Sequence, residues 1–341
     1  MKILSFIIPA YNSEPYLEKC LNSMLSPQLL PQLQIIVVND GSADRTPQIA
    51  EAYAQRFPDT VQVIHQENRG HGGALNAGCA AARGKYLKVV DADDWVQSQN
   101  LPKLLDELQQ CEADVVLTNY RTINIETGEI VNWRCFPPQF GQDYTPDQIM
   151  QDWRGYDRGL TFHGIFYRTD FYHANAAPLP EHLFYEDHVF ATFPCCRAAQ
   201  IRVLDLFIYE YRIGDVNQSV SADNQLRRLN QTMAVVQNML QQYALLPENA
   251  GRRLAAMKIR RLAMSCFTTA LLVDPNKRAG RKNADQMKAI LQKEAPEIWA
   301  MARNSAGVFY CMNRLHLNKN VWDAILHSKV YNRLRGNHNF D

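Results

Sequence analysis

The feature of this 341-residue chain that most constrains its fold is the regular alternation of apolar and amphipathic segments in its first third. Continuous apolar runs are typical of strands covered on both faces, and each run precedes a segment whose apolar residues have helical spacing. We therefore predict an α/β fold with a mostly parallel sheet flanked by helices. The expected strands are residues 3–10, 33–40, 61–66, 85–93 and 113–123, and the expected helices are 12–25, 44–57, 70–84 and 98–111.

The rest of the chain has a less regular pattern. Residues 126–129, "ETGE", predict a turn or hairpin, and residues 186–199, "EDHVFATFPCCRAA", predict one helix. From about residue 220 the pattern is helical throughout. We expect an α/β domain over residues 1–220, with halves of about 1–120 and 121–220, and a C-terminal helical region over 221–341.

Polar clusters follow each of the first four expected strands. In a parallel α/β sheet, ligands bind at the carboxyl ends of the strands. We therefore predict that the four clusters converge on one edge of the sheet and form a single site. They are "PAYN" at 9–12, "NDGSAD" at 39–44, "NRGHGG" at 68–73 and "DADD" at 91–94.

The "DADD" cluster places Asp91, Asp93 and Asp94 within four positions after a buried strand. Their mutual repulsion and desolvation make this arrangement costly. A helix N-cap would use only one of them, whereas three favour a divalent cation, Mg²⁺ or Mn²⁺, because hard oxygen ligands suit these ions. Magnesium-type ions take few protein carboxylates and let phosphates supply other ligands, so a diphosphate is the expected second partner.

The other clusters allow both turn and ligand roles. Asp40 is placed to accept hydrogen bonds from a nucleobase or ribose, and Tyr11 to offer a ring for stacking, although Asp-Gly-Ser is also ordinary turn chemistry. The run "GHGGAL" does not fit G-x-G-x-x-G, because position 75 is leucine, and it follows the third strand. NAD binding is therefore not expected, and the glycines favour close packing or backbone approach to a ligand.

Composition excludes several classes of protein. A net charge of +1 and a pI near 7.6 provide no field for nucleic acid, so we expect no nucleic-acid partner. The eight cysteines form no CxxC pair, and the N-terminus lacks a signal-peptide pattern. We expect free thiols, a cytoplasmic location and no membrane-spanning segment.

Taken together, these motifs resemble glycosyltransferase family 2, inverting enzymes with a GT-A (Rossmann-like) fold that use nucleotide sugars. The resemblance is clear over about residues 3–120 and looser to about 221. It implies a sugar transferase, with a UDP-sugar as the expected donor and a glycan or lipid-linked acceptor, in bacterial capsule, exopolysaccharide or lipooligosaccharide synthesis. The matching segments are "IIPAYN", "VVNDGSADRT", "NRGHGGALNAG", "ARGKYLKVVDADDW", "FYEDHVF" and "YRIGDVNQSVS".

The resemblance also implies roles by position. Asp93 would bind the metal directly, and Asp91 would contact the ribose or metal-bound water. Asp187 would be the general base, with its neighbour Glu186 as the competing candidate. Many family members carry arginine where this chain has Leu75, which puts the donor contact of Asn76 in doubt. The implied donor-binding residues are Pro9, Tyr11, Asn12, Glu14, Asp40, Asn76, Asp91 and Arg212.

The acceptor side is less defined by sequence. Asp94 would shape it, and Trp95 would either stack on a sugar or wedge beneath the sheet. His163 and His188 are candidates for acceptor contact or a second metal ligand, although a histidine among aromatics is more often simply packed. Asp187 has a plain alternative too, since acidic residues are favoured in a first helical turn.

Two rival functions, and a membrane as a further partner, remain as alternatives. A sugar-nucleotide nucleotidyltransferase would also use a metal and a diphosphate, but the first strand is followed by no glycine-rich, basic loop. A nucleotide-sugar-binding protein without catalysis would not need both Asp93 and Asp187. The basic and apolar C-terminal helices favour packing on the catalytic domain; alternatively, they hold the enzyme on the inner face of the plasma membrane through anionic lipids.

Overall fold

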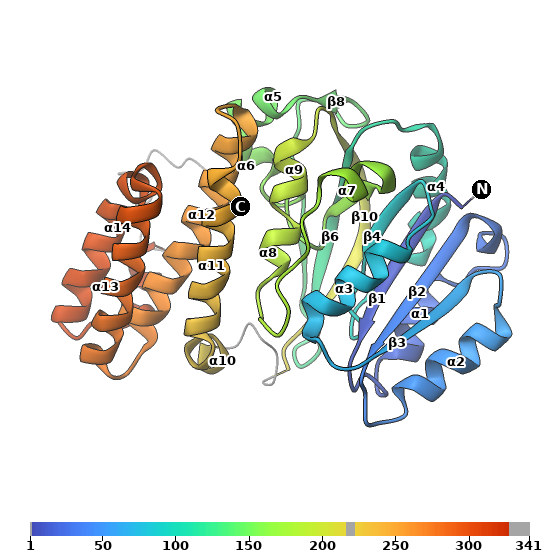
Figure 1. Cartoon of the computed structure of the whole chain (residues 1–341), viewed down its shortest axis with the longest axis horizontal. Coiled ribbons are helices and arrows are strands. Elements are labelled where there is room, and N and C mark those ends of the chain that lie inside the picture. Colours follow the sequence, from blue (N-terminus) through green and yellow to red (C-terminus); the bar gives the residue numbers. More distant parts are fainter. Residues whose placement is uncertain (1, 216–221, 327–341) are drawn as a thin grey trace. The chain divides into compact units, whose positions relative to one another are not determined.

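The computed structural model describes residues 2–215 and 222–326, which form a mixed α/β unit and a helical unit (Figure 1). The first compact unit comprises Met1–Gln218 with Leu245–Ala255, and the second comprises Ser219–Ala244 with Ala256–Asp341. The predicted α/β fold with a C-terminal helical region is confirmed. The predicted domain boundary at residue 220 stays a prediction.

The first unit is built on a ten-stranded sheet in the order β3-β2-β1-β4-β9-β6-β10-β5, with β7 paired to β6 and β8 paired to β10. Strands β1, β2, β3, β4, β6 and β10 share one direction, and the others run against them. The strands are β1 (Leu4–Ala10), β2 (Leu33–Asp40), β3 (Val61–Gln66), β4 (Tyr86–Val89), β5 (Trp95–Val96), β6 (Val115–Asn124), β7 (Ile130–Trp133), β8 (Asp143–Tyr144), β9 (Ile165–Arg168) and β10 (Ile201–Ile213).

An antiparallel strand, β9, was not among the strands predicted from the sequence. It lies between β4 and β6 and pairs Tyr167 with both Leu87 and Val115. The expected fourth and fifth strands are therefore not neighbours. Sequence periodicity identified both strands correctly but carries no information about a later segment that inserts between them.

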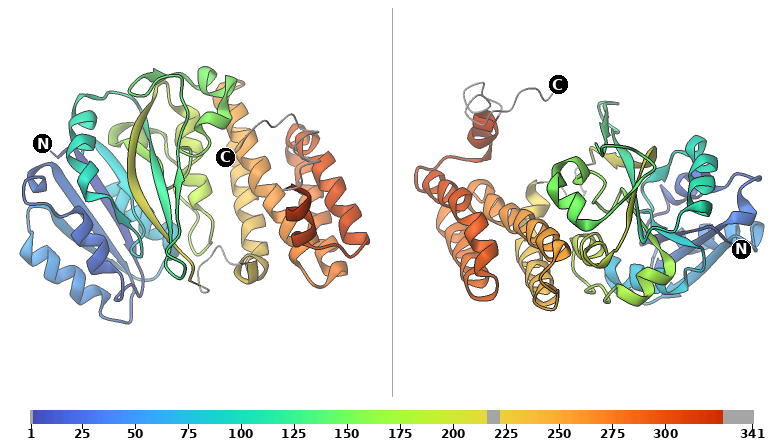
Figure 2. Two further views of the ribbon diagram at one scale, coloured as in Figure 1. Left: turned by 180° about the vertical axis from the view of Figure 1, so that it is seen from behind. Right: turned by 90° about the horizontal axis from the view of Figure 1, so that it is seen from above.

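Helices cover both faces of this sheet (Figure 2). Leu21 of α1 and Leu105 of α4 share a buried core with Phe6 of β1. On the other face α3 lies so close that a Cβ on Gly78 would stand 2.3 Å from Ile7 Cγ2. The helices of this unit are α1 (Leu17–Met24), η1 (Leu30–Gln32), α2 (Thr46–Arg56), α3 (Gly70–Ala81), η2 (Ser98–Asn100), α4 (Leu101–Gln110), α5 (Pro146–Gln151), α6 (Trp153–Tyr156), α7 (Thr169–Asn175), α8 (Asp187–Phe190) and α9 (Phe193–Arg197).

Two local predictions have different outcomes. The turn at "ETGE" is confirmed, because β6 and β7 form an antiparallel hairpin around Gly128, whose φ is +73°. The single helix predicted over residues 186–199 is wrong, since the chain breaks into α8 and α9 around Thr192. Pro194 explains the break, because proline cannot donate to the preceding turn and restricts the residue before it.

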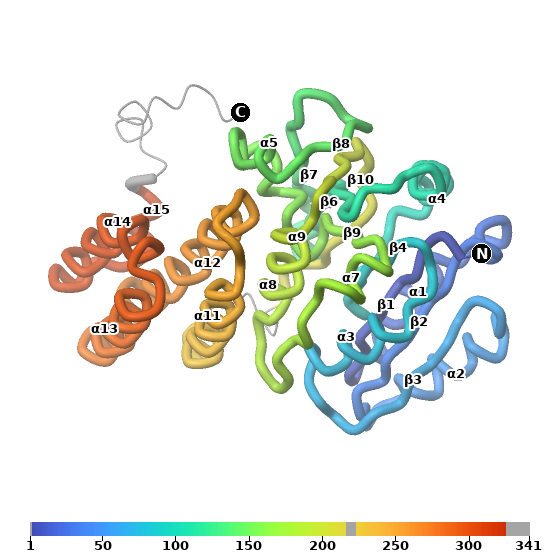
Figure 3. Tube along the Cα trace, turned by 45° about the horizontal axis from the view of Figure 1, so that its top comes forward, coloured from blue at the N-terminus to red at the C-terminus, as the bar shows by residue number. Residues whose placement is uncertain are grey.

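The second unit is helical, as predicted, and α13 packs beside α14 (Figure 3). Helix α12 starts in the first unit and continues into the second. In residues 2–215 and 222–326, no helix combines the length and hydropathy needed to cross a membrane. The helices are α10 (Ala222–Arg227), α11 (Leu229–Ala244), α12 (Ala250–Thr268), the π-helical turn η3 (Thr269–Val273), α13 (Lys277–Glu294), α14 (Pro296–Arg314) and α15 (Lys319–Leu326).

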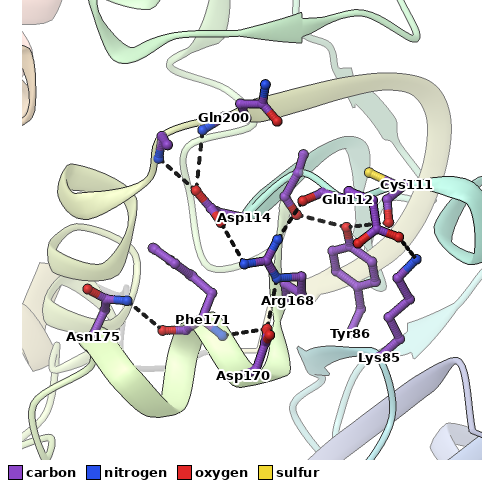
Figure 4. Close-up of polar contacts among 12 residues, drawn as sticks. Lys85, Tyr86, Cys111, Glu112, Asp114, Arg168, Asp170, Phe171, Asn175 and Gln200 are labelled. Atoms are coloured by element: carbon purple, nitrogen blue, oxygen red, sulfur yellow. Dashed lines mark hydrogen bonds and ion pairs between the residues drawn. The ribbon is translucent and has the colours of Figure 1, made fainter.

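A polar network lies at the edge of the sheet opposite the predicted site, where the amino ends of β6 and β10 meet the carboxyl end of the antiparallel strand β9 (Figure 4). Arg168 of β9 lies 3.1 Å from Asp114 Oδ1 and 2.8 Å from Asp170 Oδ1, and donates to the carbonyl of Glu112 at 2.6 Å. Asp114 also accepts from the backbone N–H of Ala199, just before β10. The network therefore joins the ends of β6, β9 and β10 and leaves the carboxyl edge to the polar loops.

Candidate active site

The four polar loops converge as predicted, because β1, β2, β3 and β4 are parallel neighbours whose carboxyl ends share one edge. Asn12 Oδ1 accepts from the N–H of Ala43 at 2.8 Å, and Glu14 Oε2 accepts from the N–H of Arg45 at 3.0 Å. These bonds lock the first two loops to each other. Asn12 and Glu14 thus shape the loop, and their predicted donor contacts stay predictions.

Asp40 joins the second loop to the third. Its buried carboxylate accepts from Gln66 Nε2 at 2.6 Å and from the N–H of Arg69 at 2.9 Å, both through Oδ1. Tyr11 is 54% exposed at the same edge, so its ring is accessible for stacking. Pro9 is the second-last residue of β1 and lies beside Val38 of β2, near the carboxyl edge of the sheet.

The three aspartates of the acidic cluster have ligand oxygens within 4.8 Å of one another. Asp94 is 1% exposed and accepts from Tyr209 Oη at 2.6 Å and from the N–H of Arg212 at 2.7 Å. Both of its oxygens therefore accept hydrogen bonds from the protein, and the predicted acceptor-side role of Asp94 stays a prediction. Asp93 differs, because its side chain is 38% exposed.

The charge on Asp93 is poorly compensated. Burial, and then repulsion by Asp91, raise the pKa of Asp93 to about 6. Closely spaced carboxylate oxygens whose negative charge is unfavourable are suited to bind a divalent cation, because such cations prefer oxygen ligands. Asp93 and Asp91 are the residues that would hold it.

Asp91 is bonded to a histidine that the sequence did not single out. Its Oδ1 lies 2.9 Å from His71 Nε2, and His71 Nδ1 is hydrogen-bonded to Glu186 Oε1. Burial acts to lower the pKa of His71, but the charges of Glu186 and Asp91 raise it well above its ordinary value. Burial likewise acts to raise the pKa of Asp91, but His71 holds it below its usual range. The signal for His71 in the sequence was a titratable residue in the glycine-rich run "NRGHGG" that follows β3.

Arg212 reaches the acidic cluster from β10. Its Nη1 lies 3.8 Å from Asp93 Oδ2 and its Nη2 3.1 Å from Asp215 Oδ2. The guanidinium also lies over the ring of Tyr16, 4.6 Å from its centroid. The position of the Arg212 guanidinium beside Asp93 is consistent with the predicted contact between Arg212 and a diphosphate. That contact stays a prediction.

The two candidate bases differ in exposure. The Glu186 side chain is 2% exposed and already bonded to His71, whereas Asp187 is half-buried at the first position of α8. Burial lowers the pKa of His163 to about 4, and the charge of Asp187 acts in the opposite direction, so these two groups lie within electrostatic range. Of the two carboxylates, Asp187 is the more accessible to solvent, and which of them acts as the base stays a prediction.

The remaining acceptor-side candidates are mostly packed. His163 stacks between Tyr120 and Tyr211, with ring centroids 5.0 and 4.3 Å away. Trp95 carries Lys19 Nζ 3.0 Å from its ring centroid, so one face of the indole is covered. Direct acceptor contacts of His163 and Trp95 stay predictions.

Asn76 and His188 were also predicted to lie at the site. Asn76 uses both ends of its amide on the backbone of Leu179, at 2.8 and 3.0 Å, which fits the doubt about its donor contact. His188 lies in the short helix α8, directly after Asp187. The predicted ligand-binding roles of Asn76 and His188 stay predictions.

A buried lysine connects the two halves of the site. Lys88 of β4 donates to the carbonyls of Phe162, His163 and Ile165 at 2.8, 2.7 and 3.1 Å. Burial lowers the pKa of Lys88 well below its ordinary value, although the charge of Asp91 acts to raise it. The signal in the sequence was a lysine inside the apolar run "KYLKVV", a position that charged residues occupy only when paired or hydrogen-bonded.

Comparisons with known proteins agree with this geometry. Residues 5–173 match the family model described as Glycosyl transferase family 2, and the chain belongs to this family. Uncharacterized glycosyltransferase EpsJ of Bacillus subtilis is 33% identical over 216 residues, which cover 62% of this chain and 61% of EpsJ. Uncharacterized glycosyltransferase YibD of Escherichia coli is 32% identical over 225 residues, 64% of this chain and 63% of YibD.

A solved structure extends the likeness of fold. The crystal structure of S. aureus TarS 1-349 in complex with UDP-GlcNAc has a TM-score of 0.64 and 21% identity, and the match covers 93% of each chain. This similarity supports the GT-A architecture over nearly the whole chain. By contrast, the chain spans only about three fifths of the length of EpsJ and YibD.

We predict that Asp93→Asn stabilises the metal-free protein. The folded-state pKa of Asp93, about 6, lies above its ordinary value of 3.8, so its contribution to stability is present at low pH and lost as pH rises through about 6. Because the side chain is over one-third exposed, we expect the variant to gain only about 1 kcal/mol at pH 7.5, and nothing near pH 4. Urea unfolding in EDTA at both pH values measures this. A variant less stable at pH 7.5, or a gain independent of pH, would contradict it.

Proposed function

We propose that this chain is a metal-dependent inverting glycosyltransferase that moves a sugar from a UDP-sugar to a glycan or lipid-linked acceptor in bacterial surface-polysaccharide synthesis. The observation that carries the proposal is the meeting of Asp91 and Asp93, after β4, with the Glu186–Asp187 pair from a separate part of the chain, through His71. Inverting transfer needs carboxylates for two tasks, metal binding and proton acceptance, and these two acidic pairs are the candidates for them.

The donor assignment rests on the carboxyl edge of the first four strands. Asp40 and the exposed ring of Tyr11 are suited to a base and ribose, and Arg212 beside Asp93 is suited to a diphosphate. The TarS structure that shares this fold was solved with UDP-GlcNAc, which supports testing UDP-sugars first. Bound between Asp93 and Asp91, a divalent cation would neutralise the charge that develops on the leaving diphosphate.

The base assignment follows from exposure. Asp187 is half-buried and Glu186 buried, so the carboxylate of Asp187 is the one accessible to an acceptor hydroxyl. In the proposed step this carboxylate accepts the hydroxyl proton while the oxygen forms a bond to the anomeric carbon. The bond from that carbon to the diphosphate oxygen breaks, and its electron pair leaves with UDP. An α-linked donor therefore gives a β-linked product.

Two rival functions remain distinguishable. A nucleotidyltransferase would release pyrophosphate from a nucleoside triphosphate and a sugar phosphate, and the family match weighs against it. A binding protein without catalysis would bind UDP-sugar but leave it intact. Neither rival needs a solvent-accessible carboxylate in the position of Asp187.

We expect UDP to bind this protein only in the presence of Mn²⁺ or Mg²⁺, and Asp93→Ala to lose that dependence with at least a tenfold fall in affinity. Isothermal titration calorimetry with UDP, with and without each metal, gives the values. Asp59→Ala is the matched control, because Asp59 is an exposed aspartate in the turn before β3. This turn lies at the amino end of β3, whereas the proposed site lies at the carboxyl ends of the strands. Wild-type UDP binding that is identical with and without metal would contradict the metal assignment.

Asp187→Asn should lower the rate of sugar transfer about 10²- to 10⁴-fold and leave UDP binding unchanged, because it removes a proton acceptor while keeping the shape. NMR of the reaction gives both the rate and the anomeric configuration of the wild-type product. Normal transfer by the variant would rule out Asp187 as base, and an α-linked product would rule out inversion.

The second unit supports a proposed peripheral contact with the inner face of the plasma membrane, where lipid-linked acceptors are presented. Helix α13 presents Arg278, Arg281 and Lys282 around a shallow hollow, and α14 exposes Met301 and Val308. We predict salt-sensitive co-sedimentation with vesicles containing phosphatidylglycerol, through attraction of the basic residues to anionic lipid. Absence of pelleting at low salt would leave these helices a packing role only.

A further inference from the structure

His71 is the residue through which the donor side and the acceptor side of the site are hydrogen-bonded to each other. It is the second residue of α3, its Nε2 lies 2.9 Å from Asp91 Oδ1, and its Nδ1 is bonded to Glu186 Oε1. Asp91 follows β4, whereas Glu186 directly precedes the proposed base Asp187. One imidazole therefore spans segments that lie far apart in the chain.

Both ring nitrogens of His71 are engaged, Nε2 with Asp91 Oδ1 and Nδ1 with Glu186 Oε1. Hydrogen bonds are directional, so two of them on one rigid ring set the separation and orientation of the two carboxylate groups. Asp91 Oδ1 is committed to His71, so the orientation of the whole Asp91 carboxylate is fixed.

The backbone around His71 is built to bring the acceptor loop this close. Gly72 is needed because a Cβ there would stand 2.2 Å from the carbonyl oxygen of Pro180 and 3.0 Å from Glu186 Cγ. The N–H of His182 donates to the carbonyl of Arg69 at 3.0 Å, just before α3 begins. The loop before α8 is therefore seated on the start of α3, and His71 receives Glu186 at a fixed position.

We propose that His71 is a positioning residue that sets the donor aspartate Asp91 and the base-bearing loop in register with each other. Through Asp91 it orients the carboxylate that faces the metal and diphosphate. Through Glu186 it fixes the start of α8, and with it Asp187. This inference rests on the proposed function for the meaning of its two ends, but the coupling between them is measurable by UDP binding alone.

A histidine that only filled space would behave differently. Its removal would lower stability, and changes to Glu186 would not reach the donor side. If His71 couples the two sides, Glu186→Ala weakens Mn²⁺–UDP binding even though Glu186 lies on the acceptor loop. The double variant His71→Ala/Glu186→Ala should then be little weaker than His71→Ala alone, because both changes break one unit.

The experiment measures Mn²⁺–UDP affinity by calorimetry, and kcat and KM for donor, on wild type, His71→Ala, Glu186→Ala and the double variant. We expect His71→Ala to lose about 10- to 100-fold in affinity and in kcat, the usual effect of removing a residue that orients a metal ligand. His65→Ala is the matched control, because His65 also pairs with a glutamate, Glu51 at 2.8 Å, but with both side chains nearly half exposed. Thermal unfolding of each variant reports the fold.

The outcomes separate this inference from the proposed function. A wild type that neither binds Mn²⁺–UDP nor transfers sugar overturns the function. A functional wild type with an unchanged His71→Ala variant, or with additive losses in the double variant, overturns only the role of His71. If His71→Ala does not fold, His71→Phe carries the same test, because its ring fills the space but donates to neither carboxylate. Wild-type affinity and kcat in folded His71→Phe would then overturn the inference, and losses like those expected for alanine would support it.

Discussion

The repulsion among carboxylates at one edge of the sheet is the constraint on which the rest of the site depends. Asp91 is hydrogen-bonded to His71, and Asp94 accepts from Tyr209 and from the N–H of Arg212. Burial, and then the charges of Asp93 and Asp91, still raise the pKa of Asp94 well above its ordinary value. Asp93 has only the more distant guanidinium of Arg212, 3.8 Å away, and its pKa is raised to about 6. Of the two carboxylates with raised pKa values, Asp94 is buried and Asp93 is over one-third exposed. Residual negative potential at one exposed carboxylate is suited to capture of a cation.

The sheet topology makes this arrangement possible. Because β1, β2, β3 and β4 are parallel neighbours, their carboxyl ends lie at one edge of the sheet. Hydrogen bonds between the loops then hold these loops together. The chain returns through β9 and the loop before α8 to bring a second acidic pair to the same place. Lys88 fastens this return, since its ammonium binds three carbonyls of the segment that enters β9. Buried charge is therefore used twice, once to fix backbone and once to fix carboxylates.

Much of the site could be predicted from the sequence, for definite reasons. The acidic cluster at Asp91, Asp93 and Asp94 could be predicted because three aspartates within four positions after an apolar run repel one another unless a cation or hydrogen-bond donors stabilise them. The long-range pairing of His71 with Glu186 was not found, because residues 115 positions apart leave no mark on local periodicity. The hydrogen bonds of Asp94 to Tyr209 and Arg212 were not predicted either, because these residues lie more than 110 positions away in the chain.

The sequence by itself determined the α/β class, the four polar loops on one edge and the family to which these motifs belong, because strand and helix periodicity and local turn chemistry are properties of neighbouring residues. Only the tertiary structure decided the insertion of β9, and which acidic residues are buried among protein hydrogen bonds and which are exposed. The reason is physical: burial and hydrogen-bond partners depend on segments brought together by folding, and they decide which of several similar carboxylates can act.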